Sequence, residues 1–139
     1  MKLRFSLITY TAANAGLILY GALVLLMPNI ILQPFSEHVY QFPEGAFRVV
    51  TYLAALFRLI GFFNFILGTL GLLILRRYKE SGQKWYLKIV MASTILAYVG
   101  PIVFDNTVGN IGFFEIVEDI LLVLMIIFGP IMLRESGEN

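Results

Sequence analysis

The amino-acid sequence predicts an all-α protein, a four-helix transmembrane bundle with both termini in the cytoplasm and an extracytoplasmic loop or helix as a cap. Three observations lead to this fold class. Hydrophobic residues make up 59% of the 139 residues, whereas soluble domains contain about 45–50%. Four apolar stretches are each long enough to cross the hydrocarbon layer, which takes about 20 helical residues. The cations gather on alternate connections between these stretches. The length fits one integral membrane domain over residues 1–139.

The first helix is predicted over residues 5–27, where Pro28 ends it. Two cations precede this stretch, as they do in a signal peptide. The apolar run before the small residues 13–15 is nevertheless only about six residues long, against the roughly 7–15 of a signal peptide. We therefore expect a retained membrane helix. Asn14 is its deepest strong polar group, and we expect an interhelical hydrogen bond there, with a ligand contact as the alternative.

The longest connection, residues 28–46, contains three prolines among apolar and aromatic residues. We expect it to lie on the membrane surface or to fold over the bundle. Pro43 and Glu44 are typical of a helix start, because proline suits the first turn and an acid suits the positive end of the dipole. His38 is the only histidine, and a single histidine without a second donor predicts a surface or capping role.

The second helix is predicted over residues 43–77, which is too long for one crossing. Its first part is expected to project from the membrane or lie in the interface, and its membrane part is expected over residues 57–75. Arg58 then lies near the outer boundary. Small or amide residues follow at spacings that put them on one face of the helix, and they are Gly61, Asn64, Gly68 and Gly71. This stripe predicts close helix packing, with a cofactor groove as the alternative.

The third helix is predicted over residues 85–104, with Trp85 as an anchor in the membrane interface. Gly100 and Pro101 are expected to kink or end it, because proline removes a backbone donor. A turn rich in Asp, Asn and Gly follows. The fourth helix is predicted over residues 112–133, and it carries acids near its start.

The charges assign the orientation. Eight of the ten cations belong to one side of the predicted membrane, and they are Lys2, Arg4, Arg76, Arg77, Lys79, Lys84, Lys88 and Arg134. Because cytoplasmic loops carry an excess of Lys and Arg, both termini are predicted to be cytoplasmic. We expect the plasma membrane of a bacterium or archaeon.

Three acids at the start of the fourth helix form the main candidate constellation. Glu115, Glu118 and Asp119 are three and four residues apart and share a helix face. Acids this close to hydrocarbon require water, a cation or a partner. Arg58 is expected at a similar depth, and we expect it to pair with Glu115 or Asp119, because neither ion is well solvated there.

Two interpretations of this constellation stay open. In the structural one, the ion pair clamps the second helix against the fourth, and the acids complement the helix dipole. In the functional interpretation, the four acids (Asp105 and the three acids of the fourth helix) outnumber the one cation, Arg58. The excess negative charge would then bind a proton, a cation or the amine of a ligand. Neighbouring aromatic residues would then wall an apolar cavity, and these are Phe62, Phe63, Phe65, Tyr98, Phe104, Phe113 and Phe114.

Several chemistries are excluded by the composition. The chain has no cysteine, so it forms no disulfide, thiolate nucleophile or soft metal site. No membrane histidine is available to ligate haem. No glycine-rich phosphate loop occurs, and no basic tract with interleaved aromatics indicates nucleic acid. We predict no metal and no cofactor. Contact with a quinone or a lipid stays open, because it requires only an apolar slot and one or two polar groups.

Four segments together resemble the small four-helix membrane proteins of the DoxX-like group, and they are LYGALVLLMP, FRLIGFFNFILGTLGLLIL, RRYKESGQK and GNIGFFEIVEDILLVL. The resemblance covers nearly the whole chain. It implies that the Arg58-x-x-Gly61 motif and Glu115 form a structural or pocket pair. Some members of that group are linked to quinone-coupled oxidation, and a related superfamily includes sterol-handling proteins. This chain lacks the histidines that an enzymatic member would use.

The sequence therefore predicts a non-enzymatic membrane protein that binds a hydrophobic or cationic small molecule, such as a lipid, quinone or sterol, beneath the outer acidic patch. The expected ligand residues are Arg58, Glu115, Glu118, Asp119, Asp105, Asn64 and Tyr98, and the expected packing residues are Gly61, Gly68 and Gly71. An accessory or scaffolding subunit of a larger membrane complex is the alternative, and an oligomeric transporter or channel subunit is the weaker one. Membrane lipids, a second copy of the chain or a larger complex are the expected partners.

Overall fold

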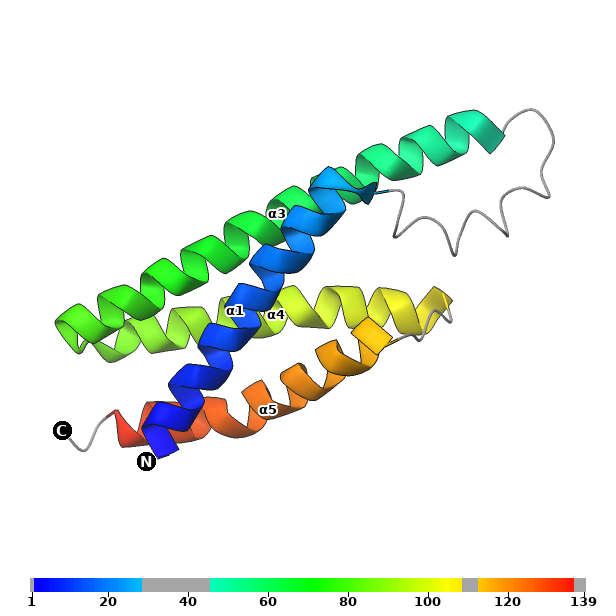
Figure 1. The fold of residues 1–139 in the computed structure, drawn as a ribbon. Helices are drawn as coiled ribbons and strands as arrows, with labels where there is room; N and C mark the ends of the chain where they lie inside the picture. Colours follow the sequence, from blue (N-terminus) through cyan, green and yellow to red (C-terminus); the bar gives the residue numbers. More distant parts are fainter. Residues whose placement is uncertain (1, 29–45, 109–112, 137–139) are drawn as a thin grey trace. The chain divides into compact units, whose positions relative to one another are not determined.

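The computed structural model describes residues 2–28, 46–108 and 113–136. These residues form α1 (Lys2–Leu26), α3 (Ala46–Ser81), α4 (Lys84–Val108) and α5 (Phe113–Glu135) (Figure 1). Each of these four helices contains a stretch long and apolar enough to cross a membrane. The predicted all-α class, with four helices of membrane-spanning length, is therefore confirmed.

Large aliphatic side chains on the outside of the helices indicate which solvent surrounds them. Leu19 is 72% exposed, Leu96 is 70% exposed and Ile126 is 53% exposed. Water-soluble proteins rarely expose contiguous apolar surface on this scale, whereas a lipid bilayer solvates it. The chain is a membrane protein.

The structure falls into two compact units. The first comprises Met1–Gly16 and Leu67–Asn139, and the second comprises Leu17–Ile66. Both α1 and α3 contribute residues to each unit, because each helix runs through a unit boundary.

The first unit contains the larger core. Helices α4 and α5 run antiparallel beside each other (Figure 1), and the first half of α1 packs against them. The fully buried apolar side chains include Tyr10, Leu87, Val90, Met125 and Met132. The backbone N–H of Leu3 donates to Glu135 Oε2 at 2.8 Å, so the first turn of α1 is fastened to the last turn of α5.

One end of this unit carries all eight cations of the predicted cytoplasmic side. Figure 1 shows the start of α1, the end of α3, the start of α4 and the end of α5 at that end. The tight connection between α3 and α4 depends on Gly82, whose φ of 68° is left-handed and whose N–H donates to the Tyr78 carbonyl at 2.8 Å. This is a common helix C-cap, in which glycine avoids the Cβ strain.

The second unit is held by a close approach of α1 to α3. A Cβ built on Gly61 would lie 2.8 Å from both the Gly21 carbonyl oxygen and the Leu25 backbone nitrogen. A Cβ on Gly21 would lie 2.5 Å from the backbone nitrogen of Phe65. The two backbones therefore touch, as small residues allow between membrane helices.

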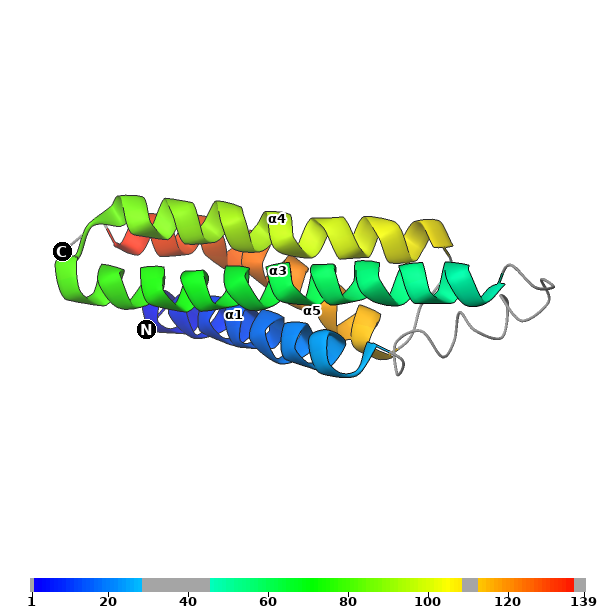
Figure 2. The ribbon, with the colours of Figure 1, turned by 90° about the horizontal axis from the view of Figure 1, so that it is seen from above.

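Helix α3 extends further at its C-terminal end than the predicted helix, which ends at residue 77. It is a single helix of 36 residues that continues past residue 77 to Ser81 (Figure 2). At about 1.5 Å per residue it is roughly 54 Å long, well beyond the roughly 30 Å of hydrocarbon. Residues 46–56 continue this helix without a break. Arg76 and Arg77 both bond Glu80, at 2.9 and 3.3 Å, and these contacts between successive turns support the extra turn.

Helix α4 also extends beyond the predicted limit of residue 104, to Val108. Of the two outcomes expected at Gly100 and Pro101, a kink or an end of the helix, the end does not occur, because Pro101 lies inside α4. The turn-forming residues after it bond their own helix instead, since Asn106 Nδ2 donates to the Ile102 carbonyl at 2.8 Å and Thr107 Oγ1 donates to the Val103 carbonyl at 2.7 Å. Proline is tolerated inside membrane helices when its surroundings satisfy the freed backbone groups.

Some predictions fall on residues that the structure does not describe. The surface loop, His38, the Pro43–Glu44 helix start and the turn over residues 109–112 lie outside the described ranges. The description of α3 begins at Ala46, and that of α5 begins at Phe113.

The glycine contact in the second unit predicts a large stability difference between two glycine substitutions. We expect Gly61→Ala to lower the free energy of unfolding by about 1–3 kcal/mol, because the methyl group overlaps the α1 backbone. A Cβ added at Gly100 would meet no atom within 4 Å, so Gly100→Ala should be neutral or should stabilise by about 0.5–1 kcal/mol. Thermal unfolding in detergent, followed by circular dichroism, measures both. Equal midpoints for the two variants would contradict the contact.

Candidate functional site

Four side chains form a polar layer inside the first unit, namely Tyr10, Asn14, Thr94 and Tyr98. All four are at least 97% buried. Tyr10 Oη donates to the Met125 carbonyl at 2.9 Å, and Tyr98 Oη donates to the Ala13 carbonyl at 2.8 Å. The polar layer therefore ties α1 to both α4 and α5.

Asn14 is at the centre of the polar layer. Its Nδ2 donates to Thr94 Oγ1 at 3.0 Å and to the Tyr10 carbonyl at 2.8 Å. The predicted interhelical hydrogen bond of Asn14 is therefore confirmed. Gly71 of α3 covers the carboxamide from another side, and any Cβ at Gly71 would collide with it. Asn14 thus contacts α4 by hydrogen bonding and α3 by packing.

Tyr98 is one of the predicted ligand residues, and the structure places its hydroxyl in the protein interior. Its one O–H donor is used on the Ala13 carbonyl. A Cβ built on Gly16 would come within 3.1 Å of this hydroxyl. The geometry gives Tyr98 a role in positioning α4 against α1.

Asn64 differs from every member of the polar layer. It lies on α3 in the second unit and is only 6% exposed. Its Nδ2 has no hydrogen-bond partner among the residues that the structure describes. The neighbouring stripe residues Gly61 and Gly68 are buried as well. The amide of Asn64 is the one buried side-chain nitrogen or oxygen left unpaired within the described ranges.

The acids of α5 lie at the helix start, as the sequence predicts. Glu115 is in the first turn, where a negative charge complements the dipole. Glu115 and Glu118 are half-buried and Asp119 is exposed. Within the described ranges, no three acidic or histidine side chains cluster closely enough to hold a metal ion.

Arg58 and Asp105 are the other two charged residues of the predicted site. Arg58 is exposed on α3 in the second unit, whereas the α5 acids belong to the first. The ion pair between Arg58 and Glu115 or Asp119 therefore stays a prediction. Asp105 is in α4, but its side chain lies outside the described residues.

Sequence reasoning missed Tyr10 and gave Thr94 no specific role. A signal for both exists in the sequence. Tyr10 precedes Asn14 by four residues and therefore shares its helix face. Thr94 and Tyr98 are also four residues apart, on the face of α4 that includes the buried Leu87 and Val90. A tyrosine or threonine on the buried face of a membrane helix requires a partner.

Comparisons with protein-family models, with curated proteins and with solved structures found no match for this chain.

The polar layer predicts that Asn14 contributes strongly to stability. We expect Asn14→Leu to lower the free energy of unfolding by about 1–2 kcal/mol, because Thr94 loses its interhelical partner. Adding Thr94→Val should recover part of the loss, since no polar group is then left unpaired. Asn106 is exposed and bonds only its own helix, so Asn106→Leu should change stability by less than about 0.5 kcal/mol. Chemical unfolding in detergent of Asn14→Leu, Thr94→Val and the double variant gives a double-mutant cycle, with Asn106→Leu as the control. Purely additive effects would contradict the Asn14–Thr94 bond.

Proposed function

We propose that this protein binds a hydrophobic small molecule in the membrane, of the lipid, quinone or sterol class, and that it does so without catalysing a reaction. The observation that carries the proposal is the unpaired, buried amide of Asn64. The molecule supplies the hydrogen-bond acceptor that the described residues do not.

The physical reason is the cost of a buried donor. An unsatisfied buried polar group costs about 1–3 kcal/mol in a protein, and no water is available in the bilayer core to reduce that cost. An ester carbonyl, a quinone oxygen or a sterol hydroxyl accepts a hydrogen bond from an amide N–H. Each of these groups is carried on an apolar body that the membrane delivers to the protein.

The same donor favours a neutral ligand over a cationic one. An N–H group points a positive partial charge at its partner, so it repels an ammonium group. Of the two ligand classes expected from the sequence, the hydrophobic acceptor therefore has the stronger support. The resemblance to the DoxX-like group points in the same direction through its quinone-linked and sterol-linked relatives.

The alternative function, an accessory subunit that docks through the glycine stripe, has less support than ligand binding. Gly61 packs on the α1 backbone in the second unit, and Gly71 packs on Asn14 in the first. Gly68 is buried as well. These glycines are used inside the chain, so a scaffolding role requires a different docking face.

We also propose an orientation with both termini in the cytoplasm of a bacterial or archaeal cell. It is supported by the eight cations at one end of the first unit, because positively charged segments are retained on the cytoplasmic side. Four crossings of the membrane then return the chain to the side on which it began.

This orientation predicts from which side of the membrane an introduced cysteine can be labelled. The test is direct because the chain contains no cysteine of its own. Ser81→Cys should react with a membrane-impermeant maleimide only from the cytoplasmic side. Thr107→Cys should react only from the outside, because Thr107 lies at the opposite end of α4. Both positions are exposed. Labelling of intact cells and of inverted vesicles measures this, and reaction of both residues from one side would contradict the crossing.

The ligand proposal predicts that Asn64→Leu abolishes binding without loss of stability. Native mass spectrometry of the full-length protein in mild detergent should show one apolar molecule bound to the wild type, or one added short-chain ubiquinone. Asn64→Leu should lose it, whereas Asn106→Leu, the same change at an exposed position, should retain it. The melting temperature of Asn64→Leu without ligand should equal or exceed that of the wild type, since the variant removes an unpaired donor.

Two results would contradict this proposal. One is a wild type that binds neither a copurified apolar molecule nor added ubiquinone or sterol. The other is retention of the molecule by Asn64→Leu with wild-type affinity.

A further inference from the structure

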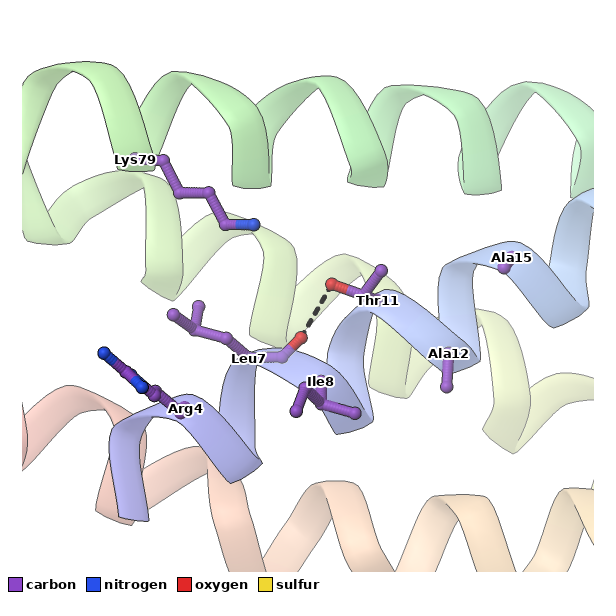
Figure 3. Close-up of a pocket in the computed structure, with 7 residues that line it drawn as sticks. All are labelled: Arg4, Leu7, Ile8, Thr11, Ala12, Ala15 and Lys79. Carbon is purple, nitrogen blue, oxygen red and sulfur yellow. Dashed lines mark hydrogen bonds between the residues drawn. The ribbon is translucent and has the colours of Figure 1, made fainter. Parts of the chain in front are cut away.

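A groove is formed by residues of the first unit alone, whereas Asn64 belongs to the second unit. It has a volume of about 480 Å³, which is in the range of ligand pockets, about 300–1,000 Å³. Figure 3 shows the groove lined by one face of α1 and by the side chain of Lys79, which reaches over from α3. The residues of α1 that line it are Arg4, Leu7, Ile8, Thr11, Ala12 and Ala15.

The walls of the groove change from charged to apolar along α1. Arg4 lies at the cationic end of the unit, and Lys79 extends from α3 towards the turn of α1 that carries Leu7 and Thr11 (Figure 3). Beyond the two cations the lining is aliphatic. Thr11 does not interrupt it, because its hydroxyl donates to the Leu7 carbonyl at 2.7 Å within its own helix. The small side chains of Ala12 and Ala15 leave the space that makes the surface concave.

Arg4 and Lys79 form no ion pair with any acid in the part of the chain that the structure describes. Among the described residues, the ion pairs are those of Arg76 and Arg77 with Glu80. No described acid pairs with Arg4 or Lys79, and both side chains are exposed. Two positively charged side chains therefore line an apolar groove without a counter-ion from the described part of the chain.

The length of the groove matches one leaflet of a membrane. From Arg4 to Ala15 the helix rises through 11 residues, or about 16 Å at roughly 1.5 Å per residue. Half of the hydrocarbon layer is about 15 Å. If the cations lie at the headgroup level, the groove ends near the middle of the bilayer, where an acyl chain of that leaflet also ends.

We propose that this groove binds one phospholipid with an anionic headgroup, in the leaflet on the cationic side of the protein. Arg4 and Lys79 contact the headgroup, since basic side chains near the surface attract anionic lipids. One acyl chain lies along α1 over Leu7, Ala12 and Ala15. This site involves residues of the first unit only and does not depend on the ligand proposed for Asn64.

The test uses delipidated full-length protein and native mass spectrometry with two added lipids of identical chains, phosphatidylglycerol and phosphatidylcholine. The wild type should bind one phosphatidylglycerol about tenfold or more tightly than phosphatidylcholine, given about 1 kcal/mol for each basic residue near the surface. The double variant Arg4→Gln with Lys79→Gln should lose this preference. Its matched control is Lys84→Gln with Lys88→Gln, which removes the same charge from two exposed lysines at the same end of the unit, and it should keep the preference.

A second variant tests the apolar part of the site. Ala12 is exposed and lines the groove, so Ala12→Phe fills the space without disturbing the core. It should weaken binding of both lipids. Leu19→Phe, a change at another exposed position of α1, should not.

Three outcomes would overturn the proposal. Equal loss of preference in both double variants would indicate diffuse attraction rather than a site. Unchanged lipid binding by Ala12→Phe would remove the acyl chain from the groove. Displacement of phosphatidylglycerol by an equal concentration of glycerol 1-phosphate would reduce the site to a plain anion site.

Discussion

The absence of water inside a bilayer is the constraint on which this structure depends. A buried polar group there must find its partner in the protein or in a ligand, because lipid tails offer none. The polar layer meets this requirement with side chains of α1 and α4 and a backbone carbonyl of α5, and each bond joins α1 to a neighbour or to its own backbone. Because hydrogen bonds are directional, they determine how the first half of α1 is rotated and how far it is shifted along its axis against α4 and α5. Contacts between aliphatic side chains are not directional and do not determine this.

Small residues act together with this polar layer. The hydrophobic effect does not drive helices together in lipid, so close van der Waals contact has to supply much of the association energy. Gly21 and Gly61 allow α1 and α3 to touch in the second unit, and Gly71 allows α3 to approach Asn14 in the first. Meanwhile many large aliphatic residues, among them Leu19, Leu96 and Ile126, are exposed on the outside of the helices. This arrangement is the reverse of a soluble domain and follows from the change of solvent.

The contrast between the two buried asparagines is the basis of the proposed ligand binding. Asn14 has two hydrogen-bond partners for its amide donor, and Asn64 has none among the described residues. Both lie on buried helix faces, so their difference does not come from burial. A satisfied amide stabilises the protein, whereas an unsatisfied one is an energetic cost that a ligand can offset. The basic groove on α1 adds a separate place where the protein meets its lipid surroundings.

Composition, apolar stretch length and charge distribution were sufficient to predict four membrane helices, because bilayer thickness sets helix length and polar segments cannot remain in hydrocarbon. The position of Asn14 on a helix face was enough to predict its interhelical bond. Sequence could not identify Thr94 as its partner, since a hydrogen bond between residues 80 positions apart depends on how the helices rotate and pack. It also could not show that the amide nitrogen of Asn64 has no partner among the described residues. The extension of α4 beyond Pro101 and the groove beside Arg4 likewise depend on neighbouring helices and side-chain contacts, which no local pattern encodes.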